Sequence, residues 1–518
     1  MIIKLKKKNV VFRNPQLFAG EAKFINLESV LSNLFLLISS GGAPITLAAP
    51  KGGHTMNSLI DNMKVLENSG KIKGAKDNIE AVEDWLRSNL VNMVFRGNVV
   101  KEHITSLRPV HLMSYRIQNK KHNRDYSMAD QLYMMLKSAP EVMSGLKDYL
   151  TTGWDNAAGH VVDSDKLDVD TAGILLLQQT LPREKKKPVT EVNNIKPLLP
   201  AQTALFNDDI RRLLFYKDKL PRIVFIEYLR ILVGLHLSLY VMKLVYLLPK
   251  MREAGTTHID DDWSMVVDMT NDLDSRVAKY ACKDAERLIN TLNRYFKTTF
   301  EINVVQPFNE VMGKDTSIEG VLNTLKNDLD KSSPLFVSEI KQIMDSISDD
   351  EDKKAIEDML QYYDADDYFD RYVHILEKTS GGSAYQYSYH LWMLDSLCMK
   401  NSDSMLLADG RRSRKHPRRG VIGSKLLETM VQLLVLQPDG NGSYVSHSLS
   451  IDELAELIRK RYGLIINGVN ESRFEGTDVE THAAFKENME ALKNKLRQIG
   501  FYTDMSDACL LQKIRPRY

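Results

Sequence analysis

Basic side chains near the C-terminus are the residues whose types and spacing most clearly suit chemistry with a ligand. Between Ala408 and Gly420 the stretch ADGRRSRKHPRRG contains six of them: Arg411, Arg412, Arg414, Lys415, Arg418 and Arg419. Glycine, proline and like-charge repulsion disfavour a helix there, so a loop is predicted. Clusters of this kind contact the phosphates of nucleic acids. The stretch therefore predicts a DNA-binding loop.

A second basic group is predicted on the last long helix, Val479 to Ile499. Apolar residues recur there at helical spacing and predict one buried stripe: Phe485, Met489, Leu492, Leu496 and Ile499. Lys486, Lys493 and Arg497 form a separate stripe beside it. We predict that these three residues also bind DNA. The alternative is that they are merely solvated, as basic residues on an exposed helix face usually are.

The elements around that helix follow the order of a winged helix. Two shorter helices precede it: Ser424 to Leu436, and a second one that begins at Ser450 with a capping box to Glu453 and ends at Gly463. After it, 501–503 and 510–514 are predicted to pair as a hairpin. In a winged helix the third helix can enter the major groove. The same fold also docks proteins, so that alternative stays open.

Two acidic clusters that include histidine have residue types that bind metal ions. In YYDADDYFDRYVH, Asp367, Asp370 and His374 share one helix face, a possible geometry for a metal site or a nuclease. A solvated acidic face is the alternative. In THIDDDW, His258 stands beside Asp260 to Asp262, and these acids are expected to cap the next helix. No catalytic residue, metal ligand or cofactor is therefore predicted.

Two further motifs have a plain and a functional interpretation. Ile45 to Asn57 imitates a phosphate-binding loop, but the G-K-[ST] end is missing and a simple turn is predicted. Tyr385, Tyr387 and Tyr389 alternate, which puts them on one side of a predicted strand, with Trp392 nearby. Such a row could stack on unpaired bases. A buried aromatic cluster is the alternative.

The composition restricts the classes of function. A hydrophobic share of 43% and a charged share of 26% are typical of soluble proteins. With a net charge of +1 the chain is no polycation, so a nucleic-acid site must be a local patch. The three cysteines, at 282, 398 and 509, give neither zinc spacing nor a disulfide framework. No targeting segment is recognised, and a cytoplasmic location without membrane association is expected.

The longest apolar stretch, Ile223 to Leu248, is expected to form the central helix of a large helical core. Its longest run without a charged residue, Ile231 to Met242, is shorter than the roughly 20 residues that a membrane span needs. Pro221 and Pro249 are expected to bound the helix.

The predicted fold class is mainly α: a multidomain helical protein with a C-terminal winged-helix-like domain. Five segments are expected. They are an N-terminal mixed, mainly helical domain (1–180), a Pro- and Lys-rich linker (181–200), a central helical domain around helix 223–248 (201–405), the basic loop (406–420) and the winged-helix-like domain (421–518).

Several C-terminal features together resemble DptG-type accessory subunits of prokaryotic phage-defence systems, which restrict DNA that lacks a protective modification. These features are the arginine-rich loop before an apolar helix, the segment SIDELAELIRKRYGLII and the late SDACLLQKI. The resemblance covers about the last fifth of the chain. It implies an accessory subunit that works with an ATPase or nuclease partner and has no chemistry of its own.

The predicted function is a non-catalytic, DNA-associated accessory subunit of a prokaryotic antiviral defence complex. Its predicted partners are DNA and an ATPase or nuclease protein. One alternative is a helical scaffold whose winged helix docks a partner protein. Another is a metal-dependent nuclease that uses the acidic cluster near Asp367.

Overall fold

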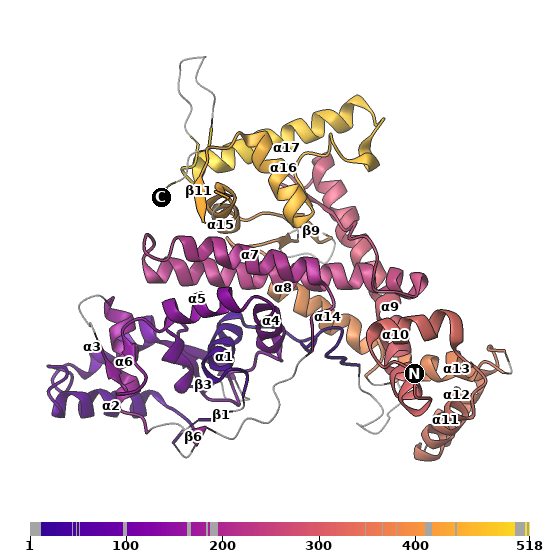
Figure 1. Ribbon diagram of the computed structural model, residues 1–518, viewed down its shortest axis with the longest axis horizontal. Helices are drawn as coiled ribbons and strands as arrows, with labels where there is room; N and C mark the ends of the chain where they lie inside the picture. Colours follow the sequence, from indigo (N-terminus) through magenta and orange to yellow (C-terminus); the bar gives the residue numbers. More distant parts are fainter. Residues whose placement is uncertain are drawn as a thin grey trace. The chain divides into compact units, whose positions relative to one another are not determined.

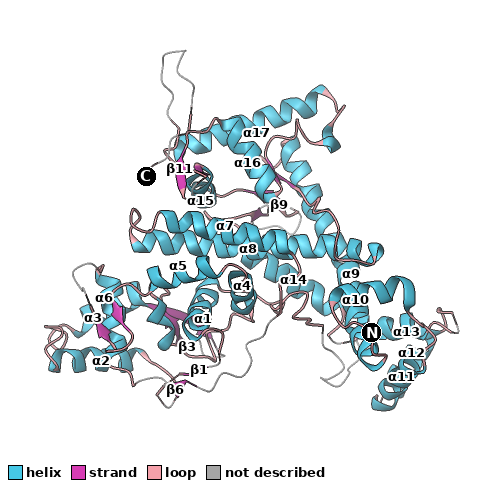
Figure 2. Cartoon of the chain, in the orientation of Figure 1, coloured by secondary structure: helices cyan, strands magenta, loops and turns pink. Residues whose placement is uncertain are grey.

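The structure, a computed structural model, describes residues 12–517 with short gaps, and these residues are mainly helical, as predicted (Figure 2). The gaps are 44, 48, 51, 97–100, 163–166, 183–184, 187–194, 348, 365, 380, 410–416, 441–442, 503–512 and 515–516. The chain folds into two compact units. Unit 1 contains residues up to Phe24, 237–437 and 445–517, and unit 2 contains 25–236 and 438–444. The five-segment division stays a prediction.

Unit 2 is built around helix α1 (Leu27–Ser40), which Asn26 caps and which packs against α4 (Met128–Lys137) and α5 (Pro140–Leu150). Its further elements follow the chain in the indigo to magenta part of Figure 1. They are β1 (Ile45–Thr46), α2 (Met56–Asn68), α3 (Ile79–Trp85), β2 (Val91–Arg96), β3 (Lys101–Leu107), β4 (Trp154–Asp155), β5 (His160–Val161), α6 (Val169–Gln179), β6 (Lys185–Lys186) and α7 (Pro200–Phe215). Strand β6 pairs with β1, so part of the predicted linker is a strand.

The central helix α8 spans Arg222–Ala254 and is longer than predicted. Pro249 lies inside it and does not end it. A proline removes one backbone hydrogen bond, but Leu248 and Met251 on either side are buried and hold the helix in the core. By length and mean hydropathy α8 is apolar enough to cross a membrane, yet 94% of its apolar window is buried inside the protein. This burial agrees with the prediction that the stretch is a core helix.

Unit 1 has a four-stranded sheet at its centre, in the order β12-β7-β9-β8. Strand β7 (Met265–Asp268) pairs in parallel with β12 (Leu464–Ile465) and β9 (Arg419–Val421), and β8 (Leu407–Ala408) pairs antiparallel with β9. A Cβ at Gly420 would lie 2.6 Å from the Val266 carbonyl oxygen, so only glycine fits this approach. The predicted basic loop at 406–420 therefore includes a strand and the start of another, because both ends of the segment join this sheet.

The helices of unit 1 gather on the sheet and on the 36-residue helix α9 (Arg276–Val311). Figure 1 shows α10 (Ile318–Asn323) to α13 (Tyr368–Glu377) beside one end of α9 and α17 (Val479–Gln498) beside the other. The remaining helices are α11 (Pro334–Ser346), α12 (Asp350–Leu360), α14 (Ser383–Leu397), α15 (Ser424–Leu434) and α16 (Ile451–Tyr462), and β10 (Leu436–Pro438) and β11 (Tyr444–Ser446) follow α15.

The last segment confirms local predictions and leaves the winged helix itself a prediction. The capping box of Ser450 and Glu453 is present, and Gly463 ends α16 in the left-handed conformation. The predicted hairpin falls largely on 503–512, outside the described residues. Ile514 forms an isolated bridge with Leu449, and β12 pairs with β7 from the middle of the chain.

Candidate nucleic-acid interface

Helix α17 is held in one orientation by the buried side chain of Asn488. Its amide nitrogen donates to the carbonyl oxygens of Val267 (3.0 Å) and Ile466 (2.8 Å). Its amide oxygen accepts from the Met269 N–H at 2.8 Å. Phe485, one turn earlier, packs in the core cluster of the sheet. Asn488 was not among the residues singled out in the sequence. The signal that could have found it is its position as a polar residue within an apolar stripe.

The predicted basic stripe lies on the outer side of α17. Lys486 is exposed, and Lys493 and Arg497 are half-buried. The charged groups of Lys493 and Arg497 lie 5.6 and 5.4 Å from the centroid of the Tyr502 ring. Among the described residues neither lysine has a carboxylate partner. At 1.5 Å per residue the stripe is about 17 Å long, which suits a row of phosphates.

Two charged residues on α17 refine this stripe. Glu490 is exposed and, at 100° per residue, falls on the stripe between Lys486 and Lys493, where it opposes their charge. Lys495 lies on the opposite side. Its ammonium donates to the Ile422 carbonyl oxygen at 2.6 Å, and burial lowers its pKa. Lys495 therefore attaches the helix to the segment after β9 and does not belong to the exposed stripe.

The predicted arginine loop divides into three parts. Arg411, Arg412, Arg414 and Lys415 lie outside the described residues. Arg418 binds Asp395 of α14 through two hydrogen bonds of 2.7 and 2.8 Å. Arg419 is buried, and its Nε lies 2.9 Å from the fully buried carboxylate of Asp268. Arg418 and Arg419 therefore connect the end of this segment to α14 and β7.

The predicted tyrosine strand is wrong, because Tyr385, Tyr387 and Tyr389 lie on helix α14. The helix follows from residues that the alternation hides: Gln386, His390, Met393 and Leu397 are buried at helical spacing. The ring centroids of Tyr385 and Tyr389 lie 4.2 Å apart, and those of Tyr389 and Trp392 lie 5.1 Å apart. Tyr385 is 39% exposed and Trp392 is 52% exposed, so the row lies at the surface.

The acidic cluster at 258–262 does not cap a helix, because strand β7 follows it. Asp261 binds Lys243 at 2.7 Å and Asp262 binds Lys250 at 2.7 Å, both on α8. Each lysine projects from the apolar helix to a position within reach of one aspartate. These acids therefore neutralise charges of the central helix.

The cluster near Asp367 is also engaged by a lysine. The Asp367 side chain caps α13 by accepting from the Asp370 N–H at 2.9 Å. Lys331 lies 2.7 Å from the Asp367 carboxylate and 2.6 Å from that of Asp370. Among the described residues no group of three or more His, Cys, Asp or Glu side chains is placed to hold a metal ion.

The segment that imitates a phosphate loop forms a turn before α2. Gly52 and Gly53 have φ values of 93° and 90°, a conformation that favours glycine. The Asn119 side chain accepts from the His54 N–H at 2.7 Å and donates to the His54 carbonyl oxygen at 2.9 Å. Thr55 then caps α2. Lys51 lies outside the described residues.

One family model matches nearly the whole chain. The model of the family described as methylation-associated defense system protein MAD7 matches residues 7–518. The chain belongs to the MAD7 family. No curated protein matches it.

Membership in the MAD7 family makes this chain a component of a methylation-associated, antiviral defence system. The prediction of a defence-system protein is confirmed at that level. The match extends the assignment from the C-terminal fifth of the chain to both units. It does not name the DptG-type subunits, whose resemblance stays a prediction.

Proposed function

We propose that this MAD7-family protein is a non-catalytic subunit that binds DNA through the basic stripe of α17. The observation that carries the proposal is that two cations of that stripe have no acidic partner among the described residues. Lys486 and Lys493 have no carboxylate partner among the described residues, whereas Lys331, Lys400 and Arg418 are each paired with acids. Cations without an acidic partner on a fixed helix are available to phosphates.

The arginine segment supplies further phosphate contacts in this proposal. The residues proposed for these contacts are Arg411, Arg412, Arg414 and Lys415, which precede Arg418 in the chain. Arg419 has no part in it, because its guanidinium is buried against Asp268. Arg418 attaches the segment to α14. Contacts of this kind bind phosphates without reading the sequence, so the proposal is one of general duplex affinity.

The accessory role rests on the chemistry of the described acids. Asp367 and Asp370 share a lysine, which disfavours the divalent cation that the alternative nuclease function needs. In this account the DNA-modifying or DNA-cleaving step belongs to an ATPase or nuclease partner in the cytoplasm, as the resemblance to DptG-type subunits implies. In this proposal residues 421–518 act as a winged helix, and α17 is its recognition helix.

The test is binding of a fluorescent duplex to the full chain at low salt. The full chain is needed because α17 and β12 pack on β7 and α9, which a C-terminal fragment lacks. We expect the Lys486→Ala/Lys493→Ala double variant to bind about tenfold more weakly, since it removes two phosphate contacts. Glu490→Gln should bind more tightly, because it removes the opposing charge of the stripe.

Lys460→Ala is the matched control. Lys460 is 65% exposed, lies on α16 of the same unit and pairs with Glu456 at 3.3 Å. It should leave duplex affinity unchanged. If the double variant and Lys460→Ala bind alike, the α17 stripe is not the interface. If the wild-type chain binds no duplex at low salt, the scaffold alternative replaces DNA binding.

A further inference from the structure

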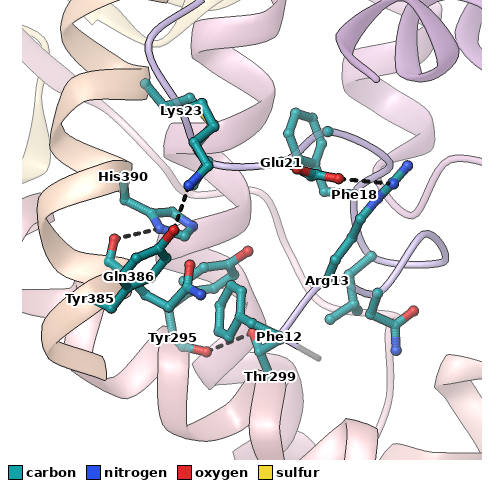
Figure 3. A pocket seen from close by; sticks show the side chains of 15 residues that line it. Phe12, Arg13, Phe18, Glu21, Lys23, Tyr295, Thr299, Tyr385, Gln386 and His390 are labelled. Atoms are coloured by element: carbon teal, nitrogen blue, oxygen red, sulfur yellow. Dashed lines mark hydrogen bonds and ion pairs between the residues drawn. The ribbon is translucent and has the colours of Figure 1, made fainter. Parts of the chain in front are cut away.

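A pocket of about 480 Å³ opens in unit 1 between the N-terminal segment and two helices (Figure 3). Phe12, Phe18, Glu21 and Lys23 come from the segment at 12–23. Tyr295 and Thr299 come from α9, and Tyr385, Gln386 and His390 from α14. The pocket is therefore walled by aromatic rings and has charged side chains at its edge.

The N-terminal wall of the pocket is fixed in place. The Asn14 amide donates to Asn303 and Gln306 of α9, each at 2.9 Å. Asn303 in turn donates to the Phe12 carbonyl oxygen at 3.0 Å. The Phe12 ring packs edge-on against four rings of α9 and α14 at centroid distances of 5.3–6.1 Å. Side-chain hydrogen bonds and ring contacts therefore attach this wall to α9 and α14.

His390 supplies a hydrogen-bond acceptor in a wall made largely of aromatic rings. It is 3% exposed, and its Nδ1 lies 2.8 Å from the Gln386 carbonyl oxygen, so Nδ1 carries the proton and donates. Burial lowers its pKa to about 4, which keeps the ring neutral. Nε2 then has only a lone pair to offer. Among the described residues no hydrogen-bond partner of Nε2 is found.

The edge of the pocket offers both donors and acceptors. Figure 3 shows Arg13 and Glu21 on the side opposite His390, 3.4 Å apart. Lys23 lies on the α14 side, where its ammonium donates to the Tyr385 hydroxyl at 2.5 Å and lies 3.5 Å from the centroid of the Tyr389 ring. A flat ligand between these walls would meet rings on its faces and polar groups on its edges.

The exposed row on α14 leads from this pocket towards Arg418. Tyr385 lines the pocket, and Tyr389 and Trp392 follow at helical spacing. One turn beyond Trp392, Asp395 holds Arg418, where the basic segment ends. From 385 to 395 the helix rises about 15 Å. Stacking surfaces therefore follow one another along α14 from the pocket to the Asp395–Arg418 pair.

We propose that this pocket binds an unpaired nucleobase of DNA and that Tyr389 and Trp392 stack its neighbours. The inference deepens the proposed DNA binding and rests on it for the phosphate contacts. His390 Nε2 accepts from the exocyclic amine of adenine or cytosine. Phe12 and Tyr385 flank the base, and Lys23 moves from the tyrosine rings to a phosphate. Aromatic walls with basic residues at the rim are the arrangement that binds single strands.

The experiment compares three probes on the full chain: a paired duplex, the same duplex with one unpaired adenine, and its single strand. 2-Aminopurine at the unpaired position reports stacking by loss of fluorescence. We expect the unpaired base to strengthen binding about tenfold, because it adds stacking on aromatic side chains that a paired base cannot make. Deoxyadenosine monophosphate serves as a competitor and shows whether the base also binds as a free nucleotide.

Variants at the surface keep the test independent of folding. Tyr385→Ala and Trp392→Ala should each remove most of the gain from the unpaired adenine and leave paired-duplex binding unchanged. Tyr362→Ala is the control, because Tyr362 is 90% exposed, lies in unit 1 and does not line the pocket. His390→Phe keeps a ring in the wall and should abolish the preference for adenine over thymine at the unpaired position.

The outcomes separate this inference from the proposed function. If paired and bulged duplexes bind alike, or if Tyr385→Ala has no more effect than Tyr362→Ala, the pocket proposal is overturned and duplex binding by α17 stands. If only probes with an unpaired base bind, the α17 proposal fails and the pocket proposal holds. If no probe binds, both fail. Competition by the free nucleotide supports the same base pocket.

Discussion

Helices α8 and α17 both have charged residues beside long apolar faces, but they use them differently. In α8, Arg230 pairs with Glu227 at 2.6 Å and Lys243 pairs with Asp261 at 2.7 Å. In α17, Lys486 and Lys493 have no such partner among the described residues. Charges that would be buried need an internal partner, whereas charges kept at the surface can serve an external one.

The comparison also divides the basic residues predicted to bind DNA. Arg419 resembles the charged groups of α8, because it is buried against Asp268 in the sheet. Lys486 is exposed on α17. Both residues are basic. Burial against an acid makes Arg419 a structural cation, whereas exposure leaves Lys486 available to a ligand. The following variants test that division.

The largest effect is expected at the buried pair. Arg419→Met should lower the free energy of unfolding by about 3–5 kcal/mol, because the Asp268 carboxylate stays buried without its partner. Urea denaturation measures it. Arg418→Ala, at a pair that is more exposed, should cost clearly less. A stable Arg419→Met protein that loses duplex binding would instead make Arg419 a DNA contact.

A similar loss is expected in the central helix. Leu239 is fully buried on α8, so Leu239→Ala should cost about 2–5 kcal/mol through lost burial and the cavity left behind. Ile223→Ala on the same helix is the control, because Ile223 is 54% exposed. Equal denaturation midpoints for the two variants would mean that α8 does not organise the core.

A gradual, pH-dependent effect follows from buried neutral histidines. Burial lowers the pKa of His111 to about 3 and that of His390 to about 4, from about 6.5. Below pH 6.5 the unfolded chain binds protons that the folded chain excludes. Stability should therefore be full above pH 6.5 and fall as the pH drops towards 4, by at most about 1.4 kcal/mol per pH unit for each histidine.

The measurement is the free energy of unfolding at several pH values. His390→Phe, which keeps a ring in the same wall, should show a shallower loss between pH 6.5 and pH 4 than the wild-type chain. An unchanged slope in this variant would show that His390 is not kept neutral by its surroundings.

The smallest expected effect is on catalysis. We expect no hydrolysis of ATP or DNA by the purified chain with magnesium or manganese, because Lys331 occupies the carboxylates of Asp367 and Asp370. Asp367→Ala should change only the stability of α13, whose cap it removes. Activity that is present in the wild-type chain and absent from Asp367→Ala would revive the nuclease alternative.

Local patterns predicted local structure well. The helical class, the capping box of Ser450 and the glycine stop at Gly463 follow from rules that act within a few residues, and each is present. The central helix was recognised by its apolar run, but its end was misplaced because tertiary packing overrides a single proline.

Features that depend on distant segments were not predictable. The sheet joins β7, β9 and β12 from three separate parts of the chain, so Asn488 and Arg419 could not be assigned their partners from spacing alone. The tyrosine row showed the two-residue period of a strand, while the buried residues between the tyrosines followed the helical period. Which lysines lack internal partners depends on the same long-range packing.

The central claim is that Lys486 and Lys493 of α17 bind duplex phosphates. The most direct measurement is the salt dependence of duplex binding by the full wild-type chain and by Lys486→Ala/Lys493→Ala. The slope of log K against log salt falls by about one for each phosphate contact that is lost. The account predicts that the double variant has a slope about two smaller in magnitude, with Lys460→Ala equal to the wild type. Equal slopes for all three proteins would contradict it.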